Sequence, residues 1–598
     1  MSVHATVILL TIINVNFLEV RSITRLTEKY IVPVDRSFTC QNQPCLTFNQ
    51  YANKSDQYFL SNTVFIFHSG FHQLDNSLRL ENIQNVSFQG NPTVGPVTVS
   101  LGPWVSLSWT NCDHIEMDSL IFNLKSNFEY GLMFSNTYNI HLHSITFSVG
   151  DESFVGCSAI TSQSSMINIS DSTFGGISGQ FGAALRLTSS EVTFTGSTSF
   201  SNNTAKLGGA IYSVNCTILV LGTTTFMNNT AVLSNTSTGE GISYCNDSYH
   251  DHSGMGGAIF GDNSDLIIRS CTTFINNGAR TLGGAIVTVN NSTVTIDGSS
   301  CFGHISDRGL SSLEGMLFYK NGITVSAVSS LLLYYQYTSN FGTGGAIYAQ
   351  KSKVNITSTV FLNNFSPRSG GAVHFNHSDV TIHNVTMVNN SGILAGAMRV
   401  FNGTIVISGT NYFEENNATR GYGGAVSIAF CVEARLDGEN YFNRNVAVNF
   451  GGALDVYAVE LLVISGINYF KKSTAINGGA VSLYNSTVHI CGDSFFENNK
   501  ASVGGAFEIE GSILTMNGTS AIVFRNNTAQ TAGGSIKSSD DSQINLSGDI
   551  QFDSNTAENG EGGAMALYDI TKVTLIPPLE ARFIKNQASK TGGAIFFC

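Results

Sequence analysis

The chain has little of what proteins with charged partners or bound metal ions rely on. Charged residues make up 12% of its 598 residues, and the formal net charge is −13. No run of basic residues occurs, so nucleic acid and anionic membrane surfaces are disfavoured as partners. The 11 cysteines include no Cys-x-x-Cys pair, which argues against a structural zinc site with clustered ligands.

Proline is also scarce, with eight residues, whereas apolar residues make up 42% of the chain and aromatic residues 10%. Low-complexity disordered segments share its pairs of glycine and asparagine. A disordered chain, however, has too little apolar surface to form a core, and this one has enough. We therefore expect a folded protein.

The apolar run at the N-terminus, Ala5 to Val15, is too short to span a bilayer. It resembles the core of a signal peptide, and we interpret residues 1–22 as one. The alternative is a buried first strand, because only His4 precedes the run and no cleavage site is evident. We expect no membrane span within this chain.

A tetrapeptide recurs along most of the chain at intervals of roughly 25 to 30 residues, which indicates a solenoid. Gly-Gly-Ala-Ile or a near variant starts at Gly208, Gly256, Gly283, Gly344, Gly370, Gly423, Gly451, Gly478, Gly504, Gly533, Gly562 and Gly592. A second motif, Phe-x-x-Asn, precedes most copies, with examples at Phe200, Phe226, Phe274, Phe361, Phe496 and Phe524.

The unit from Gly344 to Pro367 shows what one repeat forms. Gly-Gly makes a turn, and short strands are expected at Ala346-Ile347, at 354–357 and at Val360-Phe361. Asn363-Asn364 makes the closing turn. Three strands in about 26 residues form one coil of a parallel β-helix, since a propeller blade needs roughly 40 residues. The leucine-rich pattern is missing.

Stacking of the coils explains the choice of residues. Equivalent positions lie about 4.8 Å apart along the axis, so Phe361 is expected to stack beneath the Phe of the next coil. The turn asparagines are expected to form a ladder of side-chain amide hydrogen bonds. One coil cannot bury its own apolar face, so only the stack is stable.

These paired motifs resemble the repeat of the polymorphic outer membrane proteins, over about Phe174 to Cys598. That family comprises bacterial autotransporter surface proteins, and the repeat also occurs in large extracellular proteins of simple animals. The resemblance implies an all-β fold, a right-handed parallel β-helix (β-solenoid) of the pectin-lyase type. The degenerate copies at Gly182, Ala395 and Gly533 keep the period.

The repeat divides the chain into regions. Residues 23–157 lack Gly-Gly repeats but have short β-prone runs, so we expect irregular coils with an N-terminal cap. Its stretch Pro44 to Tyr51 resembles the N-terminal region of animal proteins with this repeat. Residues 158–598 form the repeated coils and end within a motif, so we expect an incomplete C-terminus.

Two intervals between repeats are long. Between Gly209 and Gly256 we expect an inserted loop from Leu233 to Ser253, and insertions in solenoids often form the binding surface. The interval from Gly284 to Gly344 spans about two periods and includes Leu331 to Tyr335. There we expect one degenerate coil and a loop.

A secreted protein permits disulfides and glycans. Cys40 and Cys45 are a plausible disulfide pair, and Cys245 could pair with Cys216 or Cys271. Roughly twenty Asn-x-Ser/Thr sequons occur, although a chain rich in these residues generates them by chance. Examples are Asn53, Asn85, Asn168, Asn215, Asn355, Asn384, Asn485, Asn517 and Asn545.

Candidates for chemistry are weak. Asp262 with Asp265 could bind a cation, and so could His250-Asp251-His252, but solvated polar turns are the simpler interpretation, as they are for Asp540-Asp541. Charged residues do not cluster at one coil of the sequence. We therefore expect no catalytic, cofactor-binding or metal-binding residue and no cofactor.

Three functions remain open. The leading hypothesis is a non-catalytic secreted or cell-surface adhesive protein whose partner is an extracellular protein or carbohydrate. The second is a bacterial autotransporter passenger at the outer membrane. The third is a polysaccharide-active lyase or hydrolase, for which paired carboxylates would be required.

Overall fold

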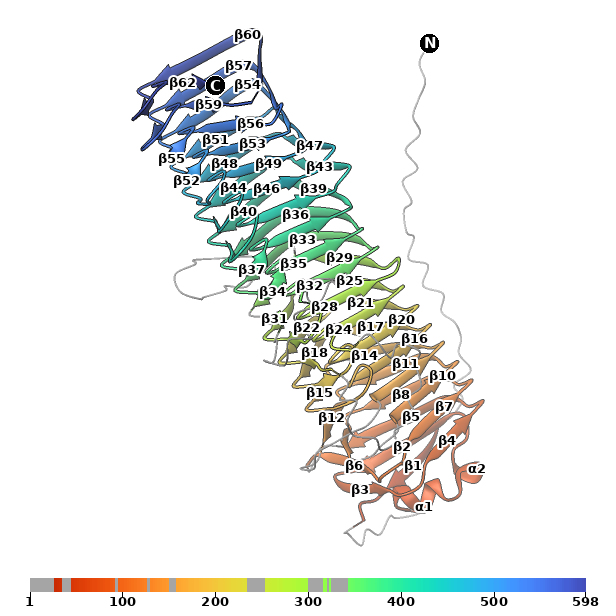
Figure 1. The fold of residues 1–598 in the computed structure, drawn as a ribbon. Helices are drawn as coiled ribbons and strands as arrows, with labels where there is room; N and C mark the ends of the chain where they lie inside the picture. Colours follow the sequence, from red (N-terminus) through yellow and green to blue (C-terminus); the bar gives the residue numbers. More distant parts are fainter. Residues whose placement is uncertain are drawn as a thin grey trace, which may run out of the picture.

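The computed structural model describes residues 26–34, 45–91, 95–125, 130–149, 158–233, 253–298, 316–319, 322–323, 342–569 and 571–598. They form an elongated, right-handed parallel β-helix of about 17 turns (Figure 1). The predicted all-β fold is confirmed. The signal-peptide prediction for residues 1–22 lies outside the described residues.

The strands that follow Gly-Gly-Ala stack in register with the equivalent strands of the first coils, and we call the whole set the GGA stack. Its 18 described strands are β4 (Leu78–Glu81), β7 (Leu107–Thr110), β10 (Tyr130–Ser135), β13 (Ser158–Gln163), β16 (Leu185–Thr188), β20 (Ile211–Val214), β24 (Ile259–Asp262), β28 (Ile286–Val289), β32 (Ile347–Gln350), β35 (Val373–Asn376), β38 (Met398–Phe401), β42 (Val426–Ala429), β46 (Leu454–Tyr457), β49 (Val481–Tyr484), β53 (Phe507–Glu510), β56 (Ile536–Ser539), β59 (Met565–Leu567) and β62 (Ile595–Phe597).

The second strand of each coil belongs to the middle stack. Its strands are β1 (Thr27–Ile31), β2 (Thr63–His68), β5 (Gln84–Asn91), β8 (Asp113–Asp118), β11 (Tyr138–His143), β14 (Met166–Ser170), β17 (Glu191–Thr195), β21 (Thr217–Val220), β25 (Asp265–Ile268), β29 (Thr293–Asp297), β39 (Thr404–Ser408), β43 (Glu433–Leu436), β47 (Leu461–Ile464) and β50 (Thr487–Ile490).

The third strand carries the Phe of the motif and belongs to the Phe stack. Its strands are β3 (Gly70–Leu74), β6 (Val97–Leu101), β9 (Ile121–Leu124), β12 (Thr146–Val149), β15 (Thr173–Gly175), β18 (Ser197–Ser201), β22 (Thr223–Met227), β26 (Thr272–Ile275), β30 (Met316–Tyr319), β40 (Thr410–Glu414), β44 (Glu439–Asn443), β48 (Ile467–Lys471) and β51 (Asp493–Glu497). In five coils one long strand serves both stacks: β33 (Lys353–Leu362), β36 (Asp379–Val388), β54 (Ile513–Arg525), β57 (Gln543–Asp553) and β60 (Lys572–Ile584).

Short corner strands lead back to the next Gly-Gly. They are β19 (Thr204–Ala205), β23 (Thr230–Ala231), β27 (Gly278–Ala279), β31 (Gly322–Ile323), β34 (Phe365–Ser369), β37 (Ser391–Leu394), β41 (Asn417–Ala418), β45 (Val446–Ala447), β52 (Lys500–Val503), β55 (Thr528–Ala532), β58 (Thr556–Ala557) and β61 (Gln587–Ala588). At the N-terminal end, helices α1 (Phe48–Ala52) and α2 (Ser55–Tyr58) lie beside the first coils (Figure 1), and α1 buries Phe48 and Tyr51 in the core.

The two glycines of each motif have different tasks. Gly478 has φ +63°, a conformation in which a side chain would be strained. Gly479 lies so close to the next coil that an added Cβ would be 2.2 Å from the carbonyl oxygen of Gly505. The first glycine therefore makes the turn, and the second permits the close approach of two backbones.

The motif Phe stacks along the interior as expected. Phe442, for example, lies 4.7 Å from Phe413 and 4.6 Å from Phe470, ring centre to ring centre, with nearly parallel planes. One part of the prediction is wrong. Phe361 does not meet a Phe in the next coil, because Met387 occupies that position.

The predicted asparagine ladder is confirmed, and it uses the last Asn of Phe-x-x-Asn. Asn527 donates from Nδ2 to Asn555 Oδ1 at 3.0 Å and to the Phe496 carbonyl at 2.8 Å, and its own Oδ1 accepts from Asn499. The Asn before it has positive φ in many coils, as at Asn526 (+52°), and makes the turn. Each buried amide is thus satisfied by the coils next to it.

A second buried polar row was not predicted. The residue after the corner between the GGA and middle stacks is Ser, Thr or Cys in most coils, and its side chain accepts from the backbone N–H of the coil before. Ser165 accepts from Thr137 N at 3.0 Å, and Ser190 accepts from Ser165 N at 3.2 Å. Cys216 belongs to this row, since its Sγ accepts from Ser190 N at 3.3 Å.

This placement decides one disulfide prediction. Cys216 is a free, buried thiol, so the pairing of Cys245 with Cys216 is wrong: its Sγ points into the row between coils and not toward a surface loop. Cys45 and Cys271 are not free thiols. Their predicted partners, Cys40 and Cys245, lie outside the described residues, so those pairings stay predictions.

Each long interval contains a single coil. Strand β20 pairs directly with β24, and β28 pairs directly with β32. In the second interval, β30 and β31 complete the coil, so the described strands of this interval make up one coil. Most of the predicted loop Leu233–Ser253, and all of Leu331 to Tyr335, lie outside the described residues.

Candidate binding surface

The sequence candidates for chemistry do not come together. Asp262 ends a GGA-stack strand, is buried, and accepts from Asn290 Nδ2 at 2.9 Å, whereas Asp265 is exposed on the middle stack. Asp540 and Asp541 form an exposed turn with φ +55° and +54°. His250-Asp251-His252 lies outside the described residues. No group of three His, Cys, Asp or Glu side chains that could hold a metal ion occurs in the described part of the chain.

The outer side of the GGA stack carries a row of polar residues, one per coil, which we call the outer polar row. Its members occupy the second position of strands β35 to β56. Consecutive members pair in register, for instance Asp455 with Ser482 and Glu508 with Lys537. The row consists of His374, Arg399, Ser427, Asp455, Ser482, Glu508 and Lys537.

Hydrogen bonds divide the row into two chains. Arg399 Nη1 donates to Ser427 Oγ at 2.7 Å, and Ser427 donates to Asp455 Oδ2 at 2.8 Å. Further along, Ser482 donates to Glu508 Oε2 at 3.4 Å, and Lys537 Nζ lies 3.3 Å from Glu508 Oε1. Each carboxylate thus has a cation either directly beside it or one serine away.

Burial sets the ionisation of this row. It raises the pKa of Asp455 to about 6, against the hydrogen bond from Ser427 and the charge of Arg399. It also raises the pKa of Glu508, although Lys537 opposes the shift. Burial together with the charges of Arg399 and Arg368 lowers the pKa of His374 to about 3, which leaves this imidazole neutral near pH 7.

Carboxylates gather at one end of the row, contrary to the expectation that charges do not cluster. Glu508 and Glu510 lie on β53, and the pKa of Glu510 is raised by burial first, then by Glu508 and a hydrogen bond with Asp540. Lys537 lies on the next coil. The sequence signal was the second residue after Gly-Gly-Ala or its variant, which is Tyr, Phe or Val in the repeats from Gly208 to Gly344 and polar or charged in those from Gly370 to Gly533.

In the coils of β20, β24, β28 and β32 the second position of the GGA-stack strand is apolar, and it belongs to a second, smaller hydrophobic cluster outside the main core. It contains Phe181, Leu207, Tyr212, Met255, Phe260, Leu282, Val287 and Tyr348. The residue just before each Gly-Gly packs against the second residue of the following strand there. The outer polar row continues this cluster toward the C-terminus, which explains why its side chains are buried.

Aromatic side chains lie on the outside of the rod in the coils of the outer polar row. On the GGA stack, Phe401, Phe430, Tyr457 and Tyr484 form a continuous column with ring centres 5.0–5.3 Å apart. On the Phe stack, Tyr412, Tyr441, Tyr469 and Phe495 form a second column with centres 4.9–5.1 Å apart. We call these the two outer aromatic columns. Both columns present large, partly exposed rings to the solvent.

Phe430 is the exception within its column. It has φ +56° at a corner where several coils have Asn, and its side chain is 48% exposed. Its ring is turned by 66° and 64° from those of Phe401 and Tyr457. A bulky residue in this conformation is strained. Because about half of Phe430 is exposed, it adds little packing to the core.

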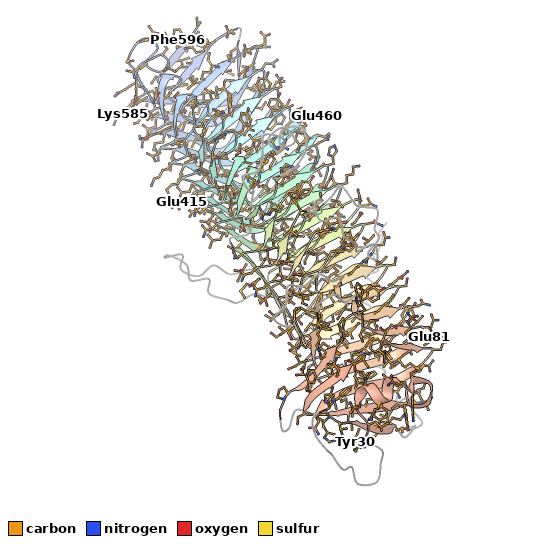
Figure 2. All side chains as sticks on the ribbon, turned by 60° about the horizontal axis from the view of Figure 1, so that its bottom comes forward. Tyr30, Glu81, Glu415, Glu460, Lys585 and Phe596 are labelled. Atoms are coloured by element: carbon orange, nitrogen blue, oxygen red, sulfur yellow. The ribbon has the colours of Figure 1, made fainter. Side chains whose placement is uncertain are left out.

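Figure 2 orients these surfaces on the rod. Glu415 follows the Phe stack and Glu460 precedes a middle-stack strand, and the two lie on opposite edges of the rod in this view. Glu415 is ion-paired with Arg444 at 2.8 Å.

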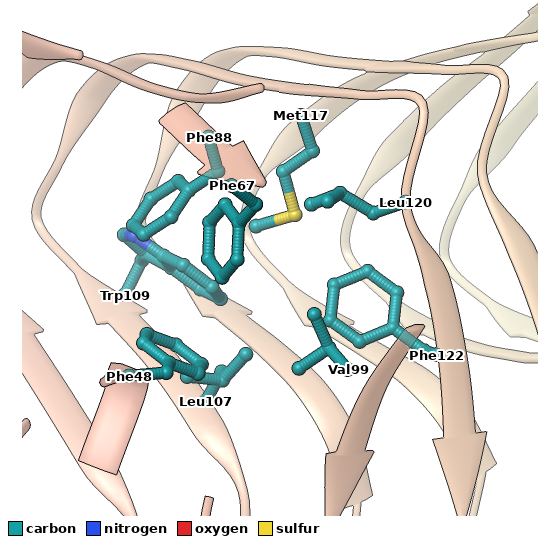
Figure 3. A pocket seen from close by; sticks show the side chains of 9 residues that line it. All are labelled: Phe48, Phe67, Phe88, Val99, Leu107, Trp109, Met117, Leu120 and Phe122. Carbon is teal, nitrogen blue, oxygen red and sulfur yellow. The ribbon is translucent and has the colours of Figure 1, made fainter. Parts of the chain in front are cut away.

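A cavity among the first coils is too small for a ligand. Its volume is about 10 Å³, and Figure 3 shows that aromatic and aliphatic side chains line it. Such a space holds one water molecule at most, and apolar walls keep it dry. It is a packing defect between α1 and the irregular coils, lined by Phe48, Phe67, Phe88, Val99, Leu107, Trp109, Met117, Leu120 and Phe122.

The family model of the Chlamydia polymorphic membrane protein (Chlamydia_PMP) repeat matches residues 197–214. This segment runs from β18 through Asn202-Asn203 and Gly208-Gly209 into β20. The chain carries a polymorphic membrane protein repeat. No curated protein matches the chain in sequence.

Three solved structures are similar at low identity. Tailspike protein 3 of bacteriophage CBA120 is 11% identical with a TM-score of 0.25, over 94% of this chain and 62% of the tailspike. The catalytic unit of an α-1,3-glucanase from Streptomyces thermodiastaticus is 12% identical with a TM-score of 0.27, over 72% of this chain and 67% of that one. The A-module of the mannuronan C-5 epimerase AlgE6 from Azotobacter vinelandii is 11% identical with a TM-score of 0.21, over 78% and 93%. The fold assignment rests on the strand pairings themselves.

The polymorphic membrane protein repeat has its motif residues inside the rod. In the matched segment, Phe200, Asn203 and Ala210 are fully buried. A partner that approaches the folded rod meets the residues between the motifs instead. The nine sequon asparagines named above are all exposed or half-buried, and their glycosylation stays a prediction.

Proposed function

We propose that the protein is a non-catalytic, extracellular or surface-displayed adhesive rod. The observation that carries the proposal is the polymorphic membrane protein repeat in an uninterrupted β-helix. A stack in which each coil contacts only its neighbours tolerates variation at outward positions. Outward side chains therefore vary in kind along the rod, while the inward ones repeat.

The two outer aromatic columns are the surface we assign to binding. Partly exposed rings supply large contact areas at little entropic cost, and they are enriched where proteins bind partners. Tyr412, Phe430 and Tyr457 are 40%, 48% and 40% exposed. The partner is an extracellular protein or a carbohydrate, as the sequence predicted. Among the described residues no helix is both long and apolar enough to cross a membrane.

Catalysis is the alternative, and one observation favours it. Asp455 and Glu508 lie on the same face, two coils apart, and glycoside hydrolysis needs two carboxyl groups flanking one bond. Both, however, are buried (6% and 4% exposed) and engaged with Ser427 and Lys537. Because neither carboxyl is open to a substrate, we favour binding without turnover.

The test combines binding with turnover. We expect the purified chain to bind at least one component of panels of glycans and extracellular-matrix proteins. A double change, Phe430→Ser with Tyr457→Ser, should weaken this binding at least tenfold. The matched control, Glu433→Ser with Glu460→Ser, alters exposed residues of the same coils outside the column and should leave it unchanged.

Sugar release from glucan, pectin or chitin panels is measured in parallel. We expect none. Reproducible turnover that Asp455→Asn or Glu508→Gln abolishes would replace the adhesive rod by an enzyme. Binding that survives the aromatic double change would move the contact surface elsewhere on the rod.

A further inference from the structure

The outer polar row begins with a group of positive charges that has no acid in contact. Arg368, at the corner strand β34, is half-buried, and its Nη1 is buried without a hydrogen-bond partner. Burial lowers the pKa of this guanidinium, and only Tyr348 opposes the shift. No carboxylate contributes.

Three further side chains complete this group, which we call the arginine cluster. Tyr348, His374 and Arg399 are consecutive partners across β32, β35 and β38. Tyr348 and His374 stack with ring centres 5.6 Å apart. Arg368 directly precedes Ser369, whose Oγ lies 3.3 Å from His374 Nδ1, and its charge lowers the pKa of both His374 and Arg399.

The charges of the cluster are incompletely balanced. Arg399 reaches an acid only through Ser427, which separates it from Asp455. His374 stays neutral near pH 7, because burial first, and then the charges of Arg399 and Arg368, lower the pKa of its imidazole. The cluster therefore holds two guanidiniums, of which only Arg399 has a carboxylate within reach, in a chain whose net charge is −13.

A buried guanidinium nitrogen without an acceptor destabilises the folded state unless something binds it. The planar fork of arginine matches carboxylate, sulfate and phosphate oxygens, and such bonds are among the strongest hydrogen bonds. Neither Tyr348, whose hydroxyl donates to Gln350 Oε1 at 3.4 Å, nor neutral His374 carries a negative charge that would repel an anion.

We propose that the arginine cluster is a binding site for a single oxyanion group, with Arg368 and Arg399 as its ligands. The same chemistry occurs in a free inorganic ion and in the uronate or sulfate groups of acidic polysaccharides. The site meets an outer aromatic column at Phe401, whose ring centre lies 5.8 Å from Arg399 Cζ. The variants that test the two proposals change other residues, Arg368 here and Phe430 with Tyr457 there, so either proposal can fail without the other.

Titration calorimetry on the full chain at low ionic strength tests the site. The probes are sodium sulfate, sodium phosphate, an oligogalacturonate, a heparin tetrasaccharide and, as the neutral control, a β-glucan oligomer. We expect saturable binding of at least one anionic probe that added sodium chloride weakens. The neutral oligomer should not compete for the cluster.

Arg368→Gln should lower the affinity for the anion about tenfold to a hundredfold, as expected for losing a hydrogen bond to a charged group. Arg444→Gln is the matched control, because it removes an exposed arginine and should leave the affinity unchanged. Arg368→Lys keeps the charge without the fork and should lie between the two. This variant decides the matter if Arg368→Gln fails to fold.

The possible results distinguish an acidic glycan, an inorganic ion and the absence of an anion site. Binding of the oligosaccharides, lost on Arg368→Gln, assigns the site to acidic glycans. Binding of sulfate or phosphate alone, lost on the same change, assigns it to an inorganic ion. If no anion binds, or if Arg368→Gln and Arg368→Lys both bind as the unmodified chain does, the arginine cluster is not an anion site.

Discussion

Gly479 shows how little freedom a single position of the coil has. Its backbone faces the next coil so closely that a Cβ would meet the carbonyl oxygens of Gly505 at 2.2 Å and Lys500 at 2.7 Å. Both are backbone atoms of the next coil, to which Gly479 N is hydrogen-bonded at Gly504 O. Glycine is therefore required here by contact, whereas Gly478 is required by conformation.

We predict that Gly479→Val destabilises its coil by several kcal/mol, since overpacking against backbone forces the stack apart. His489→Val, at an exposed strand position of the same coil, should change stability by less than about 0.5 kcal/mol. Urea unfolding of the two variants measures the difference. Equal effects would mean that the glycines reflect composition alone.

Asp455 makes stability depend on pH. Folding raises the pKa of this carboxyl from 3.8 to about 6, so the folded state prefers the protonated form. Its contribution to stability is therefore greatest below about pH 4, falls as the pH rises through 6, and then stays constant. The loss amounts to about 3 kcal/mol.

We predict that Asp455→Asn removes this dependence. Relative to the unmodified chain, the variant should gain about 2–3 kcal/mol of stability between pH 4 and pH 7. The exposed turn residue Asp541, changed to Asn, is the control and should give a profile parallel to the unmodified chain. Denaturant titrations at a series of pH values provide the measurement, and parallel profiles for all three proteins would show that Asp455 is not buried as a charge.

At the scale of the strand, β44 carries one ring inside the Phe stack and, next to it in sequence, one ring of an outer aromatic column. In β44, Phe442 points into the core between Phe413 and Phe470, and Tyr441 points outward between Tyr412 and Tyr469. The two rings have similar neighbours in their columns. Only the inner ring is fully buried.

We predict that Phe442→Ala costs about 3–5 kcal/mol, because it leaves a cavity inside the stack. Tyr441→Ala should cost much less, since water fills the space. Because repeat stability is mostly nearest-neighbour, amide exchange should accelerate first in the coils of β40 and β48. A uniform acceleration along the whole rod would contradict this coupling.

The strands also show where prediction from sequence stops. Phe-x-x-Asn and Gly-Gly-Ala predicted the aromatic row and the amide ladder, since each motif repeats with the coil. The serine row was missed because Ser, Thr, Cys and even Val459 fill it, so no single residue type repeats. The outer polar row was missed for the same reason.

At the scale of the whole molecule, the shape follows from the number of coils. The described residues contain 18 strands in the GGA stack.

We predict a rod of about 80 Å, from about 17 turns at about 4.8 Å each. Small-angle scattering should give a distance distribution skewed toward long distances, with a cross-section that does not change along the rod. A symmetrical distribution, as for a sphere, would be incompatible with the β-helix. Phe430→Ser with Tyr457→Ser should leave the scattering curve unchanged and serves as the control that the binding variant keeps its shape.

The sequence by itself determined the coil: its period, its glycine turns and the side chains that face inward. These features repeat with every coil, so local spacing is sufficient to find them. Only the tertiary structure decided which outward residues meet. Glu508 and Lys537, or Arg399 and Ser427, are more than 25 residues apart and become neighbours through the register of stacked strands. Register depends on the length of every turn and insertion between them, which pattern alone does not specify.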